Sequence, residues 1–459
     1  MSVATEAGTV DYVTLARALR DRLDGVVATP GESAYAEMVA GFHLAFRHTP
    51  PIAVSPAVVA DVATAVDAAR AAGSPVTALG EGHGFHYGIT EGIVIRTASL
   101  ASVEVDIASR TVRIGAGALW LQVAQKALPL GLTQLSGSNA EVGAVGYLMG
   151  GGLGPLGRTY GFGADSVVSF QVVVGSGEVL EVDDERHPDL FWALRGGNHG
   201  LGIVTAVTVR LVPSGDVHGD AWYYAERDAE RVLRAWVAWA PATPTRMNSY
   251  AYLLRLPDTP EVPMEIRGRN VLEIHNVWVG DPDEGEAVYA PVSSLARPIL
   301  HEPGRVREDA LPPSLVADGG VFTEALADAD VDLLWDVVGF HRSYTDFPVP
   351  VVGLQVMGGA LSTPQASPNA VAGRDAAFAL HLIDLDPDAV ASGEATRCIR
   401  AAHAAVRHRW ASGTIPNYVG PSNPAGDVLR AWTPEIGARL DEVRGRYDPA
   451  GVFRLSHTN

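Results

Sequence analysis

The sequence of 459 residues is 47% hydrophobic and holds 49 glycines and 30 prolines, so it is long enough for two or three folded domains and lacks the biased runs of a disordered chain. Its formal net charge of −19 opposes binding to nucleic acid or to an anionic membrane surface. The single cysteine, Cys398, excludes an intramolecular disulfide, and no run approaches the roughly 20 apolar residues that cross a bilayer.

The first third of the chain alternates helical and strand patterns. Residues 1–11 carry no basic stretch followed by an apolar one, so we expect no secretion signal and a cytoplasmic location. Apolar residues at helical spacing predict a helix from Ser55 to Ala72, with Ser55 as its N-cap and Gly73 as its stop. Short β-branched runs predict strands at 76–79, 93–95, 103–107 and 111–114, the last two joined by a hairpin turn at Ser109-Arg110.

Further along the chain the pattern of predicted helices and strands changes. The runs 167–174 and 179–182 predict a second hairpin around a glycine-containing turn, and 203–212 is again rich in β-branched residues. From about residue 215 tryptophans gather, and strands such as 271–279 and 378–383 alternate with longer helices such as 391–410. From residue 413 the chain is short and turn-rich. This pattern predicts a second α+β domain after the first.

One glycine cluster, Gly80-Glu81-Gly82-His83-Gly84, directly follows a predicted strand. Glycines here allow successive backbone N–H groups to turn inward and approach an anionic phosphate. Taken alone, the cluster is read equally well as a tight turn with an incidental histidine. It matches neither the dinucleotide fingerprint G-x-G-x-x-G nor a P-loop.

A second cluster runs from Gly143 to Gly163, with its greatest density at 150–154. Such density predicts no regular helix and implies a backbone pressed against a planar or bulky group. Apolar residues between the glycines, among them Val142 and Leu148, indicate a buried segment rather than a flexible loop. With a weaker cluster at 195–198, the glycines predict a nucleotide cofactor held between loops, without saying which nucleotide.

In this order the clusters resemble the FAD-binding domain of the vanillyl-alcohol-oxidase superfamily, also called the PCMH type, and above all its berberine-bridge-enzyme-like oxidases. The similar segments are 51–54, 80–84, 142–154, 160–167, 187–198, 202–205, 417–418 and 446–454, with a thinner likeness at 358–360 and Arg374. The resemblance implies an α+β fold: a split, two-subdomain FAD-binding domain and a substrate domain whose antiparallel sheet is backed by helices. We place the FAD-binding domain at 1–214 (core about 50–213), the substrate domain at 215–412, and a C-terminal segment at 413–459 that returns to the FAD-binding domain.

The resemblance also implies how the cofactor is held. The glycine-flanked His83 corresponds to the histidine that bonds the flavin 8α-carbon; His86 is the rival, and non-covalent FAD is the alternative. Many relatives add a second link through a cysteine three residues before the Val-Gly pair, where this chain has Asn139, so we expect a single attachment. The further cofactor contacts that the resemblance implies are Gly80, Glu81, Gly82, Gly84, Ser138, Asn139, Val142, Gly143, Gly146, Gly150, Gly151, Gly152, Gly154, Ile203, Val204, Asn417 and Tyr418. We predict no metal site.

Oxidation of an alcohol or amine by FAD needs a hydride acceptor and a base for the O–H or N–H proton. Tyr418 matches a tyrosine in the C-terminal motif of the family, as a base or as a flavin contact; the tyrosine often found three residues earlier is Ile415 here. His381 lies on a strand whose alternation separates it from Phe378, Leu380 and Leu382; a structural histidine is the alternative. Gln355 is a candidate for substrate binding. Further candidates for the pocket wall are Tyr147, Tyr252 and Trp278.

The resemblance thus predicts an FAD-dependent oxidase that takes a hydride from a small organic substrate and reduces dioxygen to hydrogen peroxide. Its alternatives are a monooxygenase or oxidative cyclase that tailors a secondary metabolite, a dehydrogenase, and a flavin-binding protein without catalysis. The aromatic residues of the second domain favour an aromatic or flat apolar substrate.

Overall fold

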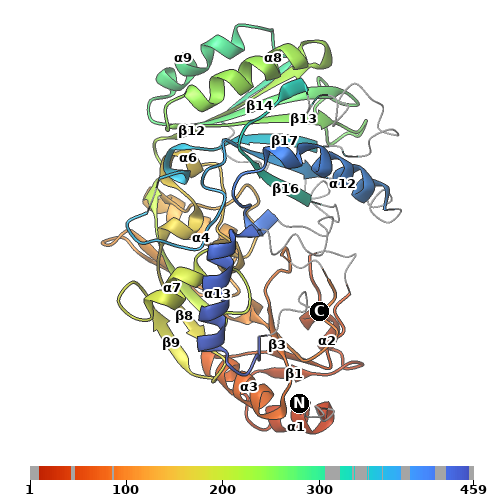
Figure 1. Cartoon of the computed structure of the whole chain (residues 1–459), viewed down its shortest axis with the longest axis vertical. Coiled ribbons are helices and arrows are strands. Elements are labelled where there is room, and N and C mark those ends of the chain that lie inside the picture. Colours follow the sequence, from red (N-terminus) through yellow and green to blue (C-terminus); the bar gives the residue numbers. More distant parts are fainter. Residues whose placement is uncertain are drawn as a thin grey trace.

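The computed structural model describes residues 10–42, 47–84, 87–304, 321–332, 335, 349, 351–363, 365–383, 393–418 and 431–453. In this part of the chain the strands form four sheets. Figure 1 shows two of them with their helices in the lower part of the molecule, and a seven-stranded sheet with helices on one face in the upper part. This α+β architecture agrees with the predicted fold class. Within the described residues, no helix is both long and apolar enough to cross a lipid bilayer.

A four-stranded sheet lies nearest the N-terminus. Its strands, in spatial order, are β1 (Val26–Ala28), β2 (Ile52–Ser55), β4 (Ile93–Arg96) and β3 (Val76–Leu79). The β1–β2 pair is antiparallel and the other two pairs are parallel. The helices α1 (Tyr12–Arg20) and α3 (Val59–Ala72) contribute the apolar residues that pack with this sheet, and the short α2 (Tyr35–Met38) lies beside β2.

The predicted helix at 55–72 exists, but its start and its cap were wrong. Ser55 remains in β2, and α3 begins at Val59. The carboxylate of Asp61 accepts hydrogen bonds from the backbone N–H groups of Ala57 (2.7 Å) and Val58 (3.3 Å), so Asp61 satisfies the open amides instead of a serine. Gly73 ends the helix in the left-handed conformation (φ 68°), as predicted.

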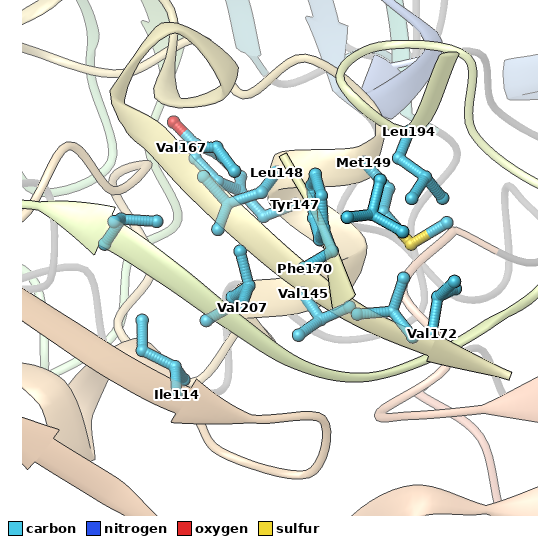
Figure 2. Close-up of a cluster of buried hydrophobic side chains, with 14 of the residues drawn as sticks. Ile114, Val145, Tyr147, Leu148, Met149, Val167, Phe170, Val172, Leu194 and Val207 are labelled. Atoms are coloured by element: carbon cyan, nitrogen blue, oxygen red, sulfur yellow. The ribbon is translucent and has the colours of Figure 1, made fainter. Parts of the chain in front are cut away.

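A five-stranded antiparallel sheet follows. Its strands, in spatial order, are β5 (Val103–Asp106), β6 (Thr111–Gly115), β10 (Ile203–Arg210), β8 (Val167–Val173) and β9 (Val179–Val182). Both predicted hairpins, β5–β6 and β8–β9, are present. The helices packed on this sheet are α4 (Trp120–Ala127), α5 (Ala144–Met149) and α7 (Pro188–Leu194), and their shared core is shown in Figure 2. A small pair, β7 (Leu132–Thr133) and β11 (Val212–Pro213), lies beside it.

The glycine-rich segment at 143–163 does contain regular helix, contrary to the prediction. Residues 144–149 form α5 and Gly157–Tyr160 form α6. Five of the six residues of α5 are buried, and only Gly146 is exposed. Because the apolar side chains of α5 follow helical spacing, their burial outweighs the low helix propensity of one glycine.

The seven-stranded sheet is antiparallel throughout. Its strands, in spatial order, are β15 (Leu300–Pro303), β12 (Val217–Ala225), β14 (Asn270–Val279), β13 (Met247–Arg255), β17 (Val351–Val356), β18 (Phe378–Ile383) and β16 (Val321–Leu326). The helices α8 (Glu226–Trp239), α9 (Pro282–Ser293) and α12 (Glu394–Val406) cover one face. Of the helix predicted at 391–410, residues 391 and 392 lie outside the described part.

The last described segment returns to the N-terminal half of the chain. Helix α13 (Pro434–Tyr447) runs along α7 (Figure 1). The indole of Trp432 donates to the carbonyl of Gly196 (2.9 Å), and the hydroxyl of Tyr447 donates to Asp189 (2.8 Å). Beyond α13, the amide of Val76, the first residue of β3, donates to the carbonyl of Val452 (2.9 Å). The C-terminal segment therefore packs on α7 and bonds to the edge strand β3, both formed by the first half of the chain.

Candidate active site

The loop that carries His83 begins where β3 ends. Gly82 has a positive φ of 84°, and a Cβ added there would lie 3.0 Å from the Cα of Gly41, so only glycine fits between the two segments. The imidazole of His83 stacks on the ring of Phe42, with 3.8 Å between ring centroids and 21° between planes. His83 is half-buried. The rival residue, His86, lies outside the described residues.

A set of hydrogen bonds ties this loop to the segment at 40–42. The amide of Phe42 donates to the carbonyl of Glu81 (2.8 Å). The guanidinium of Arg96, the last residue of β4, donates to the carbonyls of Ala40 (2.9 Å) and Gly80 and pairs with the carboxylate of Glu81 at 3.5 Å. The glycine pattern alone did not indicate Arg96 or Phe42, because both lie outside the cluster in sequence.

Three of the predicted cofactor glycines face open space. A Cβ built at Gly84, Gly143 or Gly146 would meet no protein atom within 4 Å, and one at Gly80 would meet only a side-chain oxygen at 3.9 Å. At such positions the backbone can approach a bulky group closely, and we call the open space at Gly84, Gly143 and Gly146 the cradle. Gly146 is the exposed residue of the otherwise buried α5, so a helix with a packed core presents bare backbone to this space. The residues present therefore fit a large planar cofactor.

The segment between β7 and α5 borders this cradle. Ser138 and Asn139 are half-buried, and the side-chain oxygen of Asn139 accepts the amide of Glu141 (2.8 Å) in a local turn. Val142 packs at the edge of the core, and its carbonyl accepts the amide of Trp120 (3.1 Å). The Asn139 position thus belongs to an ordered turn that leads directly into α5.

The glycines at 150–154 differ from Gly84, Gly143 and Gly146, because protein atoms lie close to each of them. A Cβ at Gly150 would lie 2.4 Å from the amide of Asn417, one at Gly152 would lie 2.5 Å from the ring of Tyr147, and one at Gly154 would lie 2.1 Å from a carbonyl. Gly151 has a φ of 104° and faces the side chain of Val371 at 3.4 Å. These glycines make room for close packing of protein on protein, and their predicted contact with the cofactor stays a prediction.

Asn417 links the C-terminal motif to this glycine loop. It lies in the 3-10 turn η8 (Pro416–Tyr418), and its side chain accepts the amide of Gly152 (2.7 Å) and donates to the carbonyl of Tyr147 (3.0 Å). Tyr418 follows it in the same turn, and the placement of its side chain lies outside the described part. Ile415 is buried in an apolar cluster with Leu153. The structure thus brings the backbone of the predicted Asn-Tyr pair to the predicted glycine loop.

The two predicted contacts on β10 have buried side chains. Ile203 packs into the core of the four-stranded sheet and Val204 into the core of the five-stranded sheet. Only their backbones are therefore left for a cofactor contact, which stays a prediction.

The face of the seven-stranded sheet opposite its helices turns toward the glycine loops. Val277 and Val279 on this face pack on Leu135 and Leu156, and Gln355 donates to the carbonyl of Gly154 (3.4 Å). This face carries buried polar and aromatic side chains. They are Tyr223, Tyr250, Tyr252, Glu273, His275, Gln355 and His381. Tyr223, Tyr250 and Tyr252 pack in an apolar cluster with Val262 and Ile266, whereas the buried polar groups make this face a candidate for the substrate side of the site.

Several residues of this polar face were missed or misplaced by sequence reasoning. The alternation of His381 against Phe378, Leu380 and Leu382 is as predicted. Trp278 lies on the helix side of the sheet against Gly285 of α9, on the opposite face from Gln355 and His381. Glu273 and His275 were overlooked, although polar residues alternate there with the apolar run of β14.

The candidate site residues on this face of the sheet differ in their chemistry. The side-chain amide of Gln355 also donates to the hydroxyl of Tyr250 (3.0 Å), which fixes both groups on neighbouring strands. Burial lowers the pKa of His381 to about 4, so its imidazole is neutral at neutral pH. Tyr250 stacks with Tyr252 (5.9 Å between centroids) and with His275 (5.8 Å).

The buried His381 predicts a loss of stability in mild acid. In the unfolded chain the residue binds a proton as the pH falls through 6.5, whereas in the folded protein it does so only near pH 4. The unfolded state therefore takes up more protons between these values, and we expect His381 to lower the free energy of unfolding by about 2 kcal/mol from pH 7 to pH 5. Urea unfolding of the His381→Gln variant at both pH values should show a pH dependence smaller by that amount.

An exposed histidine serves as the control for this measurement. His408→Gln removes a surface imidazole from the turn η7 (Arg407–Arg409) and should leave the pH dependence of the parent protein unchanged. Equal pH dependence in the parent and in His381→Gln would show that His381 is not a buried neutral group.

The comparisons with known proteins agree with this geometry. A family model described as "FAD binding domain" matches residues 50–183. The chain is 36% identical over 162 residues to the FAD-dependent monooxygenase FUP4 of Fusarium proliferatum, which covers 35% of this chain and 31% of FUP4. It is 25% identical to the FAD-linked oxidoreductase YgaK of Bacillus subtilis over 96% of this chain and 97% of YgaK. It is also 25% identical to the (R)-6-hydroxynicotine oxidase of Paenarthrobacter nicotinovorans over 80% of this chain and 81% of that enzyme.

Solved structures share the fold at low sequence identity. A chitooligosaccharide oxidase superposes with a TM-score of 0.82 at 17% identity and covers 96% of this chain and 98% of its own. The glucooligosaccharide oxidase of Acremonium strictum, which carries a 6-S-cysteinyl, 8α-N1-histidyl FAD, superposes with a TM-score of 0.80 at 18% identity over 96% of this chain and 97% of its own.

The matched FAD-binding domain and the relatives named as FAD-linked oxidoreductases and oxidases support the class: the protein is an FAD-linked oxidoreductase. Residues 50–183 match the FAD-binding domain model, and the fold is that of the berberine-bridge-enzyme-like and PCMH-type FAD oxidases. The resemblance predicted from the glycine clusters is thereby confirmed.

Proposed function

We propose that the protein is an oxidase that removes a hydride from a small organic alcohol or amine and passes the electrons to dioxygen, with release of hydrogen peroxide. The observation that carries this proposal is the open space at Gly84, Gly143 and Gly146, where Gly84 directly follows His83 in its loop. Bound in the cradle, FAD supplies the hydride acceptor and the route of two electrons to dioxygen.

The proposal includes a covalent bond between FAD and His83. Its support is the position of His83 in a glycine loop that is fixed by Phe42 and Arg96, together with the histidyl FAD of the glucooligosaccharide oxidase. That oxidase also has a cysteinyl link. Asn139 occupies the corresponding position in the family motif here, and an amide side chain does not form such a bond. We therefore propose one attachment, through His83.

The sheet face supplies substrate contacts in this proposal. Gln355, fixed by its hydrogen bond to Tyr250, provides a hydrogen-bonding group on this face beside the stacked rings of Tyr250 and Tyr252. Its pKa of about 4 makes His381 a weak proton acceptor near neutral pH. We therefore propose that His381 helps to shape this face and does not act as the base. Tyr418, which follows Asn417 at the glycine loop, is the proposed proton acceptor.

Acid denaturation followed by an SDS gel tests the covalent bond. We expect flavin fluorescence on the band of the wild-type protein and none on the band of His83→Ala, because no other residue replaces the lost nucleophile. His86→Ala is the matched control and should keep full fluorescence. Fluorescence that survives in His83→Ala and disappears in His86→Ala would move the attachment to His86. A wild-type protein purified without any flavin would contradict the proposed function as a whole.

A monooxygenase is the second candidate, and two observations favour it. FUP4, a relative with this FAD-binding domain, is named a monooxygenase, and Asn139 differs from the cysteine common in the family. The two functions differ in the fate of oxygen. An oxidase yields one hydrogen peroxide per substrate and a product two hydrogens lighter, whereas a monooxygenase yields a product heavier by one oxygen atom. Peroxide assay and mass spectrometry on the first substrate found will separate them.

A further inference from the structure

The ring stack between Phe42 and His83 is a contact that the cofactor motif does not contain. The centroids lie 3.8 Å apart and the planes are within 21° of parallel. A partner on the face of an imidazole fixes the plane of the ring through dispersion and leaves the in-plane nitrogens at the edge of the stack. The stack therefore restricts the rotation of the His83 ring.

Phe42 is itself attached to the loop that it orders. Its backbone amide donates to the carbonyl of Glu81 (2.8 Å), two residues before His83. Gly82 approaches the Gly41–Phe42 segment so closely that an added Cβ would lie 3.0 Å from the Cα of Gly41 and 3.1 Å from the amide of Phe42. Backbone and ring thus hold the same short loop at two points.

Arg96 fixes both partners to the sheet. Its guanidinium donates to the carbonyl of Ala40 (2.9 Å) on the Phe42 side and to the carbonyl of Gly80 on the His83 side. Arg96 is the last residue of β4, and its side chain is only 15% exposed. Because one guanidinium spans the two segments, the stack is anchored to the rigid part of the domain.

We propose that Phe42 is a positioning residue for flavin attachment: it holds the imidazole of His83 in the orientation from which a ring nitrogen reaches the 8α-carbon. This inference rests on the proposed bond to His83. In the net reaction the imidazole N–H and one methyl C–H are lost, one N–C bond forms, and dioxygen accepts the two hydrogens with two electrons and leaves as hydrogen peroxide. A bond-forming step depends steeply on the orientation of its reactants, whereas binding of FAD by the glycine loops does not require the stack.

The test separates attachment from binding. Protein is produced in a host depleted of riboflavin, FAD is added, and acid-stable flavin is followed over time; FAD affinity is measured separately by flavin fluorescence in the His83→Ala background. The variant Phe42→Leu keeps an apolar side chain and removes the ring. We expect its attachment rate to fall by about tenfold or more, as loss of orientation implies, with FAD affinity within about threefold of the parent. Phe42→Trp restores a stacking ring and should restore the rate.

A matched core variant controls for general destabilisation. Phe170→Leu removes a fully buried ring from the five-stranded sheet, in edge contact with Phe191, and should lower stability without slowing attachment. Attachment by Phe42→Leu at the parental rate, or a rate not restored by Phe42→Trp, would overturn the role of Phe42 while the bond to His83 stands. Absence of acid-stable flavin in the wild-type protein would instead overturn the proposed bond itself.

Discussion

Replacing Gly146 by alanine is expected to impair FAD binding and, at the same time, to leave the apo-protein folded and slightly more stable. Gly146 lies inside α5, where alanine is favoured over glycine by about 0.5–1 kcal/mol. In the protein an added Cβ meets nothing within 4 Å. If FAD fills that space, the methyl group overpacks the contact and weakens binding by about 1–3 kcal/mol. Affinity is measured by flavin fluorescence in the His83→Ala background, and stability by thermal unfolding of the apo-protein.

The chain offers a matched control for this substitution. Gly445 lies inside α13, is exposed, and also has open space at its Cβ. Gly445→Ala should give the same gain in helix stability and leave FAD affinity unchanged, since α13 does not border the cradle. Unchanged FAD affinity in Gly146→Ala would mean that the space beside α5 is not where the cofactor lies.

Replacing Arg374 by methionine is expected to lower the free energy of unfolding by about 3–5 kcal/mol, the usual cost of leaving a buried charge without its partner. Arg374 pairs with Asp165 at 2.7 Å, and the side chain of Asp165 is only 2% exposed. The carboxylate also accepts the side chain of Asn369 (2.6 Å) and the amide of Phe162 (2.9 Å), so the pair joins the glycine-rich segment to the segment after β17. Urea unfolding of the apo-protein measures the effect.

Two further variants give this prediction its controls. Arg446 pairs with Asp189 but is 70% exposed, so Arg446→Met should cost less than about 1 kcal/mol. Adding Asp165→Asn to Arg374→Met removes the stranded charge and should recover part of the loss. A cost for Arg374→Met no larger than that for Arg446→Met would show that the Asp165 site is not a low-dielectric one.

Much of the cofactor domain could be predicted from the sequence because its information is local. Alternation and turn residues gave both hairpins, and Gly73 gave the end of α3. The errors have physical causes. Ser55 was assigned as a cap because serine often caps helices, but the amides there are satisfied by Asp61 from inside the helix. The glycines around α5 suggested irregular chain, although burial of its apolar face was sufficient to form the helix.

The site could be predicted only in part. The glycine loop and His83 could be predicted from one short stretch of sequence and a family resemblance. Phe42 and Arg96 contact the loop from other segments, and no local sequence pattern indicates such contacts. Alternation placed His381 on the correct face of β18, but its lowered pKa comes from burial in the assembled sheet. Glu273, which lies on the same face three strands away, was missed because one strand does not show what the adjacent strands place beside it.

The bonds between distant segments bear on when the protein becomes functional during synthesis. The amide of Gly152 is satisfied by Asn417, 265 residues later, and β3 receives its edge bond from Val452. While the ribosome is still making the second domain, the first half of the chain lacks these partners and exposes an unfinished glycine loop and sheet edge. A chain cut after residue 416 would therefore lack both bonds, the one to the glycine loop and the one to the edge strand β3.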